Sequence, residues 1–238
     1  MPPPPPAAAT TLRPALTADG LAPAADGRNV VDPQELDVSR LPPNAFDWHA
    51  PLWWANLLTL FIETATIGLL LATYFYLMRN EQGWPPPLTN RVPAVAHPVP
   101  RLAVGTINTV LLVLSCGLMY AVDVWARRLD EAKLRRGMVA LCAVTVLSIA
   151  LRWYEFPAFH FKWNDNAYGS IVWTILGMHL IYLLVGLGEF ALMTAWVYRY
   201  GLDEKHALDV TLVGAYWYWV AGAWVLVYTV LYWVPRWV

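Results

Sequence analysis

From Leu52 to the C-terminus, the chain alternates between long apolar blocks and shorter polar connections. A helix needs roughly 20 residues to cross ~30 Å of hydrocarbon, and five of the blocks are about that long. They cover approximately residues 53–78, 102–125, 137–154, 168–198 and 211–234. Membrane β-barrels show alternating segments of ~10 residues instead. The pattern therefore predicts an all-α, polytopic membrane domain over residues 49–238, built as a bundle of five transmembrane helices.

The first 48 residues follow a different pattern. Five consecutive prolines come directly after Met1, and the segment continues with much Pro, Ala, Asp and Gly. It lacks the basic region and the apolar core of a signal peptide. A segment with so little apolar surface to bury does not order by itself. We therefore expect residues 1–48 to form a disordered extension or to lie along a partner protein.

The composition supports a membrane protein. Of the 238 residues, 58% are hydrophobic and 14% are charged, whereas soluble domains carry about 25% charged residues. Fourteen residues are tryptophan, which collects at membrane interfaces. The formal net charge of −1 provides no basic surface for nucleic acid. These values argue against a soluble enzyme and against a nucleic-acid-binding protein.

The distribution of basic residues predicts an orientation. The connection at residues 126–136 carries five Lys and Arg side chains, and short cytoplasmic loops are enriched in these residues. The N-terminus is therefore expected in the cytoplasm and the C-terminus outside, in an inner (plasma) membrane of bacterial type. Arg152 stands at the end of the third apolar block, from where its long side chain is expected to reach the lipid headgroups.

Two carboxylic acids, Glu63 and Glu189, lie inside predicted helices. A carboxylate at mid-membrane costs roughly 2.5–3.5 kcal/mol on insertion scales. At 1.5 Å per residue, each acid is ~15 Å from the inner end of its helix, so both should lie at a similar depth. For either acid, two interpretations stay open: a neutral, hydrogen-bonded packing group, or a group linked to protons or lipid.

Glu63 belongs to a polar stripe on its helix. The members of the stripe recur at spacings of three, four and seven residues, which places them on one face. They are Asn56, Thr59, Glu63, Thr66 and Thr73. Such a face packs against protein, headgroups or water rather than acyl chains.

The histidines do not favour a metal site. Haem and copper sites in helical bundles need several histidines at one depth, but only His179 is inside a predicted helix. The others fall at helix ends or in loops: His49, His97, His160 and His206. We expect no catalytic residue, no redox cofactor and no metal on this chain, and we expect Cys116 and Cys142 to be buried thiols. The residues alone fit a structural or regulatory subunit, or less well a small proton-coupled transporter.

A series of short motifs, in order, resembles cytochrome c oxidase subunit III in its short five-helix form. The motifs are Phe61-Ile62-Glu63, Ala72-Thr73-Tyr74-Phe75-Tyr76, Trp84-Pro85-Pro86, Asn108-Thr109, Glu155-Phe156, Asp165 with Tyr168-Gly169-Ser170, and Gly177-Met178-His179. The chain departs from the family pattern where Tyr182 replaces a histidine and where Arg152 replaces a glutamine. Glu189 has no counterpart in the pattern. The resemblance therefore indicates a divergent member.

The resemblance implies a role without redox chemistry on this chain. Haem and copper are expected in the partner subunits I and II, and this chain would pack mainly on subunit I and bind phospholipid in a cleft. It would sustain proton uptake and turnover stability of an oxidase that reduces oxygen, with cytochrome c or quinol as electron donor. The buried glutamate of the family corresponds to Glu63, and Asn108, Glu155 and His179 fall on other polar positions. An accessory protein of a nitric oxide reductase is the alternative.

Overall fold

The computed structural model describes residues 22–23, 29–30, 51–81, 83–88, 98–203 and 206–237. The chain divides into two units, Met1–Pro42 and Pro43–Val238. In the first unit, β1 (Ala22–Pro23) and β2 (Asn29–Val30) pair antiparallel, with Ala22 opposite Val30. The rest of the segment 1–48, for which the sequence predicts disorder, lies outside the described residues.

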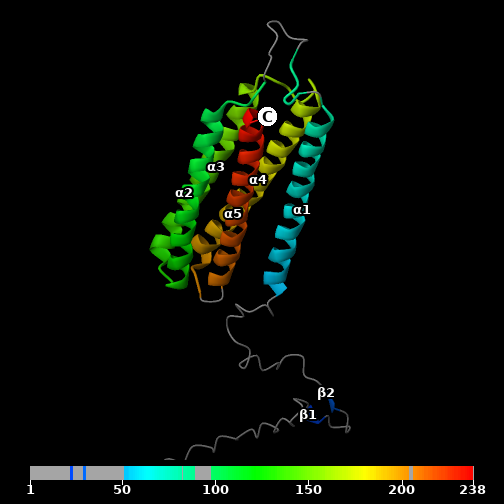
Figure 1. The fold of residues 1–238 in the computed structure, drawn as a ribbon. Coiled ribbons are helices and arrows are strands. Elements are labelled where there is room, and N and C mark those ends of the chain that lie inside the picture. Colours follow the sequence, from blue (N-terminus) through cyan, green and yellow to red (C-terminus); the bar gives the residue numbers. More distant parts are fainter. Residues whose placement is uncertain are drawn as a thin grey trace, which may run out of the picture. The chain divides into compact units, whose positions relative to one another are not determined.

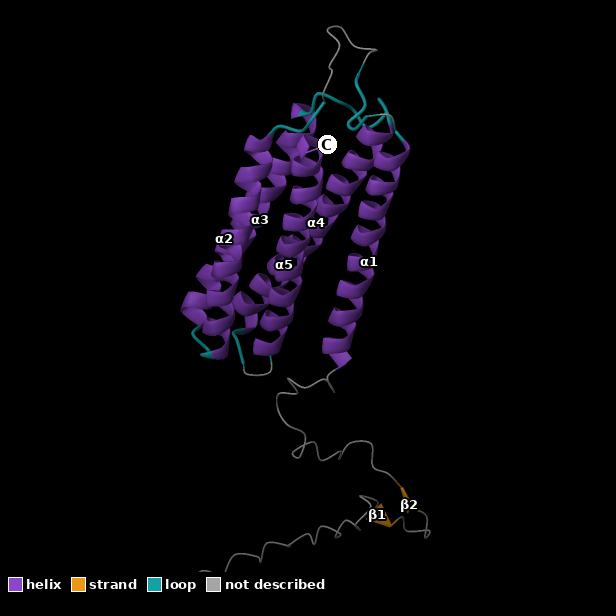
Figure 2. Ribbon diagram, in the orientation of Figure 1, coloured by secondary structure: helices purple, strands orange, loops and turns teal. Residues whose placement is uncertain are grey.

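The second unit is a helical bundle (Figures 1 and 2). Its long helices are α1 (Pro51–Asn80), α2 (Leu102–Arg127), α3 (Glu131–Glu155), α4 (Ala167–Tyr200) and α5 (Ala207–Tyr228). A 3-10 turn, η1 (Phe156–Ala158), extends α3, and a π-helical turn, η2 (Thr229–Trp233), joins α5 to α6 (Val234–Trp237). Among the described residues, five helical spans are long and apolar enough to cross a membrane: α1, α2, α3 with η1, α4, and α5 with η2 and α6. The prediction of an all-α, multi-pass membrane protein with five spanning helices is confirmed.

The third and fifth helices begin earlier than the hydrophobic pattern predicts. The predicted start of the third helix is residue 137, but α3 begins at Glu131 because Asp130 caps it: the backbone N–H of Lys133 donates to Asp130 Oδ1 at 3.2 Å. The basic residues expected in a loop therefore lie largely on the first turns of α3. Similarly, α5 begins at Ala207 rather than at residue 211. The α3 start is rich in charged residues, so a search for apolar blocks does not include it. The α5 start is preceded by a turn in which the backbone N–H of His206 donates to Asp203 Oδ1 at 3.0 Å.

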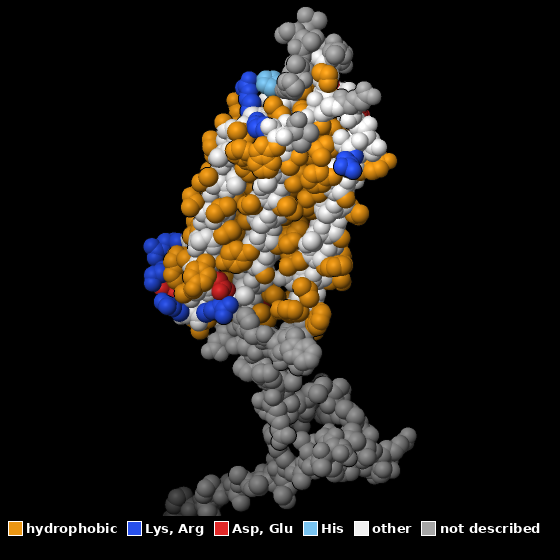
Figure 3. Space-filling view, in the orientation of Figure 1, with side chains coloured by type: hydrophobic (Ala, Val, Ile, Leu, Met, Phe, Trp, Pro, Cys, Tyr) orange, Lys and Arg blue, Asp and Glu red, His pale blue; other side chains and the backbone are white. Residues whose placement is uncertain are grey.

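The core lies between α2, α3, α4 and α5, whereas α1 packs mainly on α4 and α5 (Figure 1). Only Ile67, Leu71 and Tyr74 of α1 are buried. Large apolar side chains cover the exposed sides of the bundle, and charged side chains gather at its ends (Figure 3). An apolar outer surface of this kind suits contact with lipid or with other membrane-spanning subunits.

Candidate functional site

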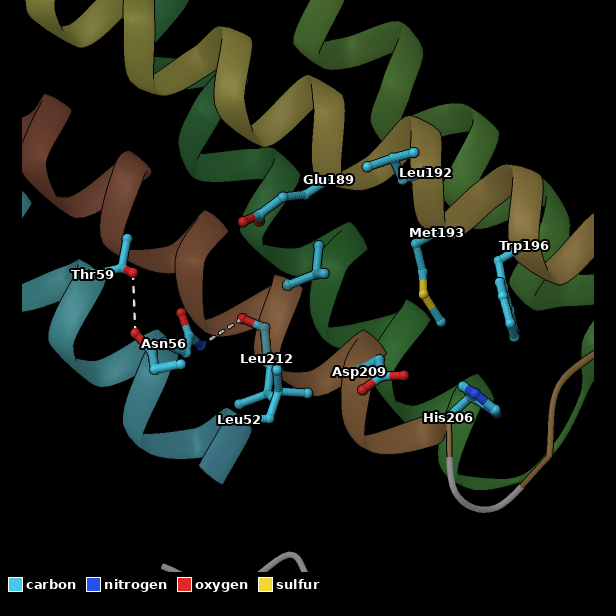
Figure 4. Close-up of a pocket in the computed structure, with 12 residues that line it drawn as sticks. Leu52, Asn56, Thr59, Glu189, Leu192, Met193, Trp196, His206, Asp209 and Leu212 are labelled. Carbon is cyan, nitrogen blue, oxygen red and sulfur yellow. Dashed lines mark hydrogen bonds between the residues drawn. The ribbon is translucent and has the colours of Figure 1, made fainter. Parts of the chain in front are cut away.

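A cleft of about 530 Å³ lies between α1, α4 and α5, near the residues where α1 and α5 begin. Its walls are mostly apolar, with polar groups at the inner end and at the mouth (Figure 4). The polar lining residues are Asn56 and Thr59 from α1, Glu189 from α4, and His206 and Asp209 at the start of α5. The structure therefore places two of the candidate residues, Thr59 and Glu189, in one cleft.

Glu63 lies one helical turn beyond Thr59, where α1 faces α5. The Tyr216 hydroxyl of α5 donates to Glu63 Oε1 at 3.3 Å and also lies 3.4 Å from the backbone carbonyl of Tyr182 in α4. The second oxygen, Glu63 Oε2, is buried and has no hydrogen-bond partner among the described residues. Tyr216 thus connects the carboxyl group on α1 to the other two helices.

Glu189 belongs to the same region. Its Oε2 atom is also buried without a hydrogen-bond partner in the described part of the chain. Glu189 lines the cleft together with Thr59, which precedes Glu63 by one turn of α1. Three helices therefore bring two acids and one phenol together. We call Glu63, Glu189 and Tyr216 the carboxyl cluster.

The polar stripe of α1 has two kinds of members. Asn56 Nδ2 donates to the backbone carbonyl of Leu212 at 3.1 Å and so ties α1 to α5. The hydroxyls of Thr59 and Thr66 donate to backbone carbonyls one turn earlier in their own helix, at 3.0 and 2.9 Å. These threonines satisfy their hydroxyls locally and need no partner from another helix.

A second polar region lies near the end of α3. Arg152 and Glu155 form an ion pair in which Arg152 is 0% and Glu155 2% exposed, and the Tyr232 hydroxyl of η2 donates to Glu155. The guanidinium carbon of Arg152 lies 3.7 Å from the centre of the Trp224 ring. The prediction that Arg152 reaches the headgroups is wrong. The Arg152 side chain points into the bundle toward α5, where the Trp224 ring covers the guanidinium group. Glu155, one turn later on α3, neutralises its charge.

His179 and Asn108 are also fully buried. His179 packs on Trp224 with the ring centres 4.9 Å apart, and its Nε2 lies 3.3 Å from the backbone carbonyl of Val220. Ser148 donates to Asn108 Oδ1 at 2.6 Å, which links α3 to α2. Arg152 and His179 both pack on the Trp224 ring of α5. We call the buried polar side chains Asn108, Ser148, Arg152, Glu155 and His179, which come from α2, α3 and α4, the buried polar network.

Of the remaining described histidines and cysteines, His206 lines the cleft, whereas His160, Cys116 and Cys142 do not. His160 lies between α3 and α4 and His206 at the start of α5, while His49 and His97 lie outside the described residues. Cys116 and Cys142 are free and half-buried rather than buried. Each thiol instead lies near an oxygen: the Leu112 carbonyl at 3.4 Å for Cys116 and the Thr194 hydroxyl at 3.7 Å for Cys142.

A family model for cytochrome c oxidase subunit III matches residues 60–236, which include the carboxyl cluster and the buried polar network. The chain belongs to the cytochrome c oxidase subunit III family. It is 25% identical over 183 residues to cytochrome c oxidase subunit 3 of Thermostichus vulcanus, covering 76% of this chain and 86% of that protein. It is 27% identical over 130 residues to the Rhizopus stolonifer subunit and 25% over 148 residues to the Sus scrofa subunit. These two alignments cover 55% and 59% of this chain, and 46% and 54% of the relatives.

Sequence reasoning missed three residues that organise the two regions of this subunit III family member. Tyr216 donates a hydrogen bond to Glu63 and Tyr232 donates one to Glu155. Arg152 forms an ion pair with Glu155. The i, i+3 spacing of Arg152 and Glu155 places them on one helix face, and this spacing was a usable signal. Neither tyrosine had such a signal, because its partner is more than 70 positions away in the sequence.

Proposed function

We propose that this chain is the non-redox subunit III of a respiratory haem-copper terminal oxidase. The observation that carries the proposal is the family match over residues 60–236, with Glu63 held by Tyr216 beside the cleft. In this proposal, haem and copper sit in subunits I and II, and this chain packs mainly on subunit I. The membrane is an inner (plasma) membrane of bacterial type, with the N-terminus in the cytoplasm and the C-terminus outside.

The cleft between α1, α4 and α5 is proposed to bind a phospholipid. Leu52, Leu192, Met193 and Leu212 give it apolar walls that suit an acyl chain. His206 and Asp209 stand at the start of α5, the end of the spanning helix where the lipid headgroup is proposed to lie. A lipid in this position would cover the otherwise open face of α1.

The carboxyl cluster is proposed to support proton uptake. Glu63 Oε2 and Glu189 Oε2 are buried without a hydrogen-bond partner among the described residues. Burial disfavours the charged form of a carboxyl group, so each acid can hold a proton. The Tyr216 hydroxyl can donate its hydrogen bond either to Glu63 on α1 or to the Tyr182 carbonyl on α4, because it lies within hydrogen-bond distance of both. The cluster would therefore hold protons near the oxidase without taking part in oxygen reduction.

The test of this function uses the assembled oxidase with Glu63→Gln, Glu189→Gln and both substitutions. Glutamine keeps the shape and hydrogen bonding of the side chain but removes the titratable proton. We expect full haem content and initial oxygen reduction, with slower proton uptake and earlier inactivation during turnover. Tyr216→Phe should give a smaller effect in the same direction.

Two results would contradict this role. Loss of oxygen reduction in a fully assembled, haem-loaded Glu63→Gln complex would place Glu63 at the redox chemistry. Unchanged proton uptake and turnover life in the double variant would make the cluster a packing feature only. Thr73→Val is the control. The Thr73 hydroxyl donates to the Leu69 carbonyl of the same helix, so the variant should behave as the parent.

A further inference from the structure

A second groove, of about 400 Å³, lies on the outside of the bundle between α2 and α3. It is lined by Leu118 and Trp125 of α2 and by Lys133, Arg136, Gly137 and Ala140 of α3. Leu118 and Ala140 are each nine residues from the adjoining helix ends, so the groove extends ~14 Å along the helices at 1.5 Å per residue. This region is separate from the cleft and from the buried polar network.

Gly137 shapes the floor of this groove. A Cβ atom at this position would lie 2.5 Å from Val122 Cγ2 and 2.9 Å from Trp125 Cζ3. The glycine therefore lets α2 and α3 approach closely and lets the indole of Trp125 lie against α3. Leu118, Trp125 and Ala140 are half-buried, so they leave apolar surface open along the groove.

The mouth of the groove is positively charged. Lys133 and Arg136 are exposed there, and the residues from Asp123 to Arg136 include five Lys and Arg against three acids. Figure 3 shows this concentration of basic side chains at the α2–α3 end. Lys133 pairs with Asp130 at 2.7 Å. Arg136 donates from Nε to the backbone carbonyl of Ala132 at 3.1 Å, and its side chain is exposed.

We propose that this groove binds an anionic phospholipid of the inner leaflet. The phosphate would lie against Arg136 and Lys133, and one acyl chain would follow Leu118, Trp125 and Ala140 into the membrane. The charge complementarity favours an anionic headgroup, because a juxtamembrane Lys or Arg adds affinity for anionic lipids. The apolar floor continues well below the charged mouth, which suits an acyl chain, whereas an extended peptide would leave its backbone groups unsatisfied in hydrocarbon.

The experiment uses the full chain in detergent, titrated with phosphatidylglycerol or phosphatidylcholine and measured by native mass spectrometry. The parent chain should retain a first phosphatidylglycerol much more tightly than a first phosphatidylcholine. Lys133→Gln with Arg136→Gln should weaken phosphatidylglycerol binding roughly 25-fold, at roughly five-fold per charge. Ala140→Phe fills the acyl groove and should weaken binding of both lipids.

Two control variants keep this test specific. Arg199→Gln removes a charge near the same membrane face, at the end of α4, and Ala150→Phe adds an exposed ring farther along α3. Both should bind phosphatidylglycerol like the parent. The proposal is overturned if the charge variant retains the lipid, or if Ala140→Phe has no effect. It is also overturned if a cross-linker joins Lys133 to an acidic segment of another subunit in the assembled oxidase, because a protein would then occupy the groove.

Discussion

Glu155→Gln tests the buried polar network most sharply, because it leaves Arg152 charged inside the bundle. Removing one partner of a buried ion pair costs about 3–5 kcal/mol. Arg152 is 0% exposed, and its Nε and Nη2 atoms have no hydrogen-bond partner among the described residues. The Trp224 ring, at 3.7 Å, remains in the variant and stabilises the cation. We therefore expect Glu155→Gln to lower the free energy of unfolding by an amount near the lower limit, about 3 kcal/mol.

The assay is reversible unfolding of the full chain in mixed micelles, followed by helical circular dichroism. The double variant Arg152→Gln/Glu155→Gln removes both charges, so it should lose less free energy of unfolding than Glu155→Gln alone. Arg135→Gln is the matched control, since it breaks a partly exposed pair with Glu131 on the same helix and should cost under about 1 kcal/mol. The reasoning is refuted if Glu155→Gln unfolds like the parent, or if the double variant is less stable than Glu155→Gln.

Two further predictions concern α2 and α3. Gly137→Ala should lower the free energy of unfolding by about 1–3 kcal/mol, because the new Cβ would overlap Val122. Gly117→Ala is the control and should not destabilise the chain, because nothing lies within 4 Å of its new Cβ. Equal midpoints of thermal unfolding for the two variants would count against this. The hydrogen bonds from Lys133 lower the pKa of the Asp130 carboxyl below its usual value, so the cap stabilises α3 fully above about pH 4. This contribution is lost as the pH falls through the lowered pKa, and Asp130→Asn should show a weaker loss of stability on acidification than the parent.

The sequence was sufficient for the elements that depend on apolar length. The five apolar blocks correspond to α1–α5 because a membrane span needs a continuous run of apolar residues. The helix starts at Glu131 and Ala207 were missed because both depend on local hydrogen bonds, and because the first turns of α3 are charged. Arg152 was misplaced for a related reason: the pattern showed the end of an apolar block, but not which neighbour the side chain faces.

The candidate site was predictable in part. The rise per residue indicated a similar depth for Glu63 and Glu189, and the structure places Glu63 against Tyr216 and Glu189 in the adjoining cleft. That tyrosine could not be predicted, because the contact depends on how α5 packs on α1, and nothing in either helix alone specifies it. Likewise, Thr59 and Thr66 fit the stripe by spacing, but whether a threonine bonds its own helix or another requires the packed structure.

Purification of the assembled complex tests the central claim most directly. The chain would carry an affinity tag, be extracted from its native membrane in mild detergent, and be analysed by peptide identification and a reduced-minus-oxidised optical spectrum. The proposed function predicts that subunits I and II of a haem-copper oxidase co-purify, with haem bands and oxygen reduction in the same fraction. Purification of the chain alone, or with the subunits of a nitric oxide reductase, would contradict it.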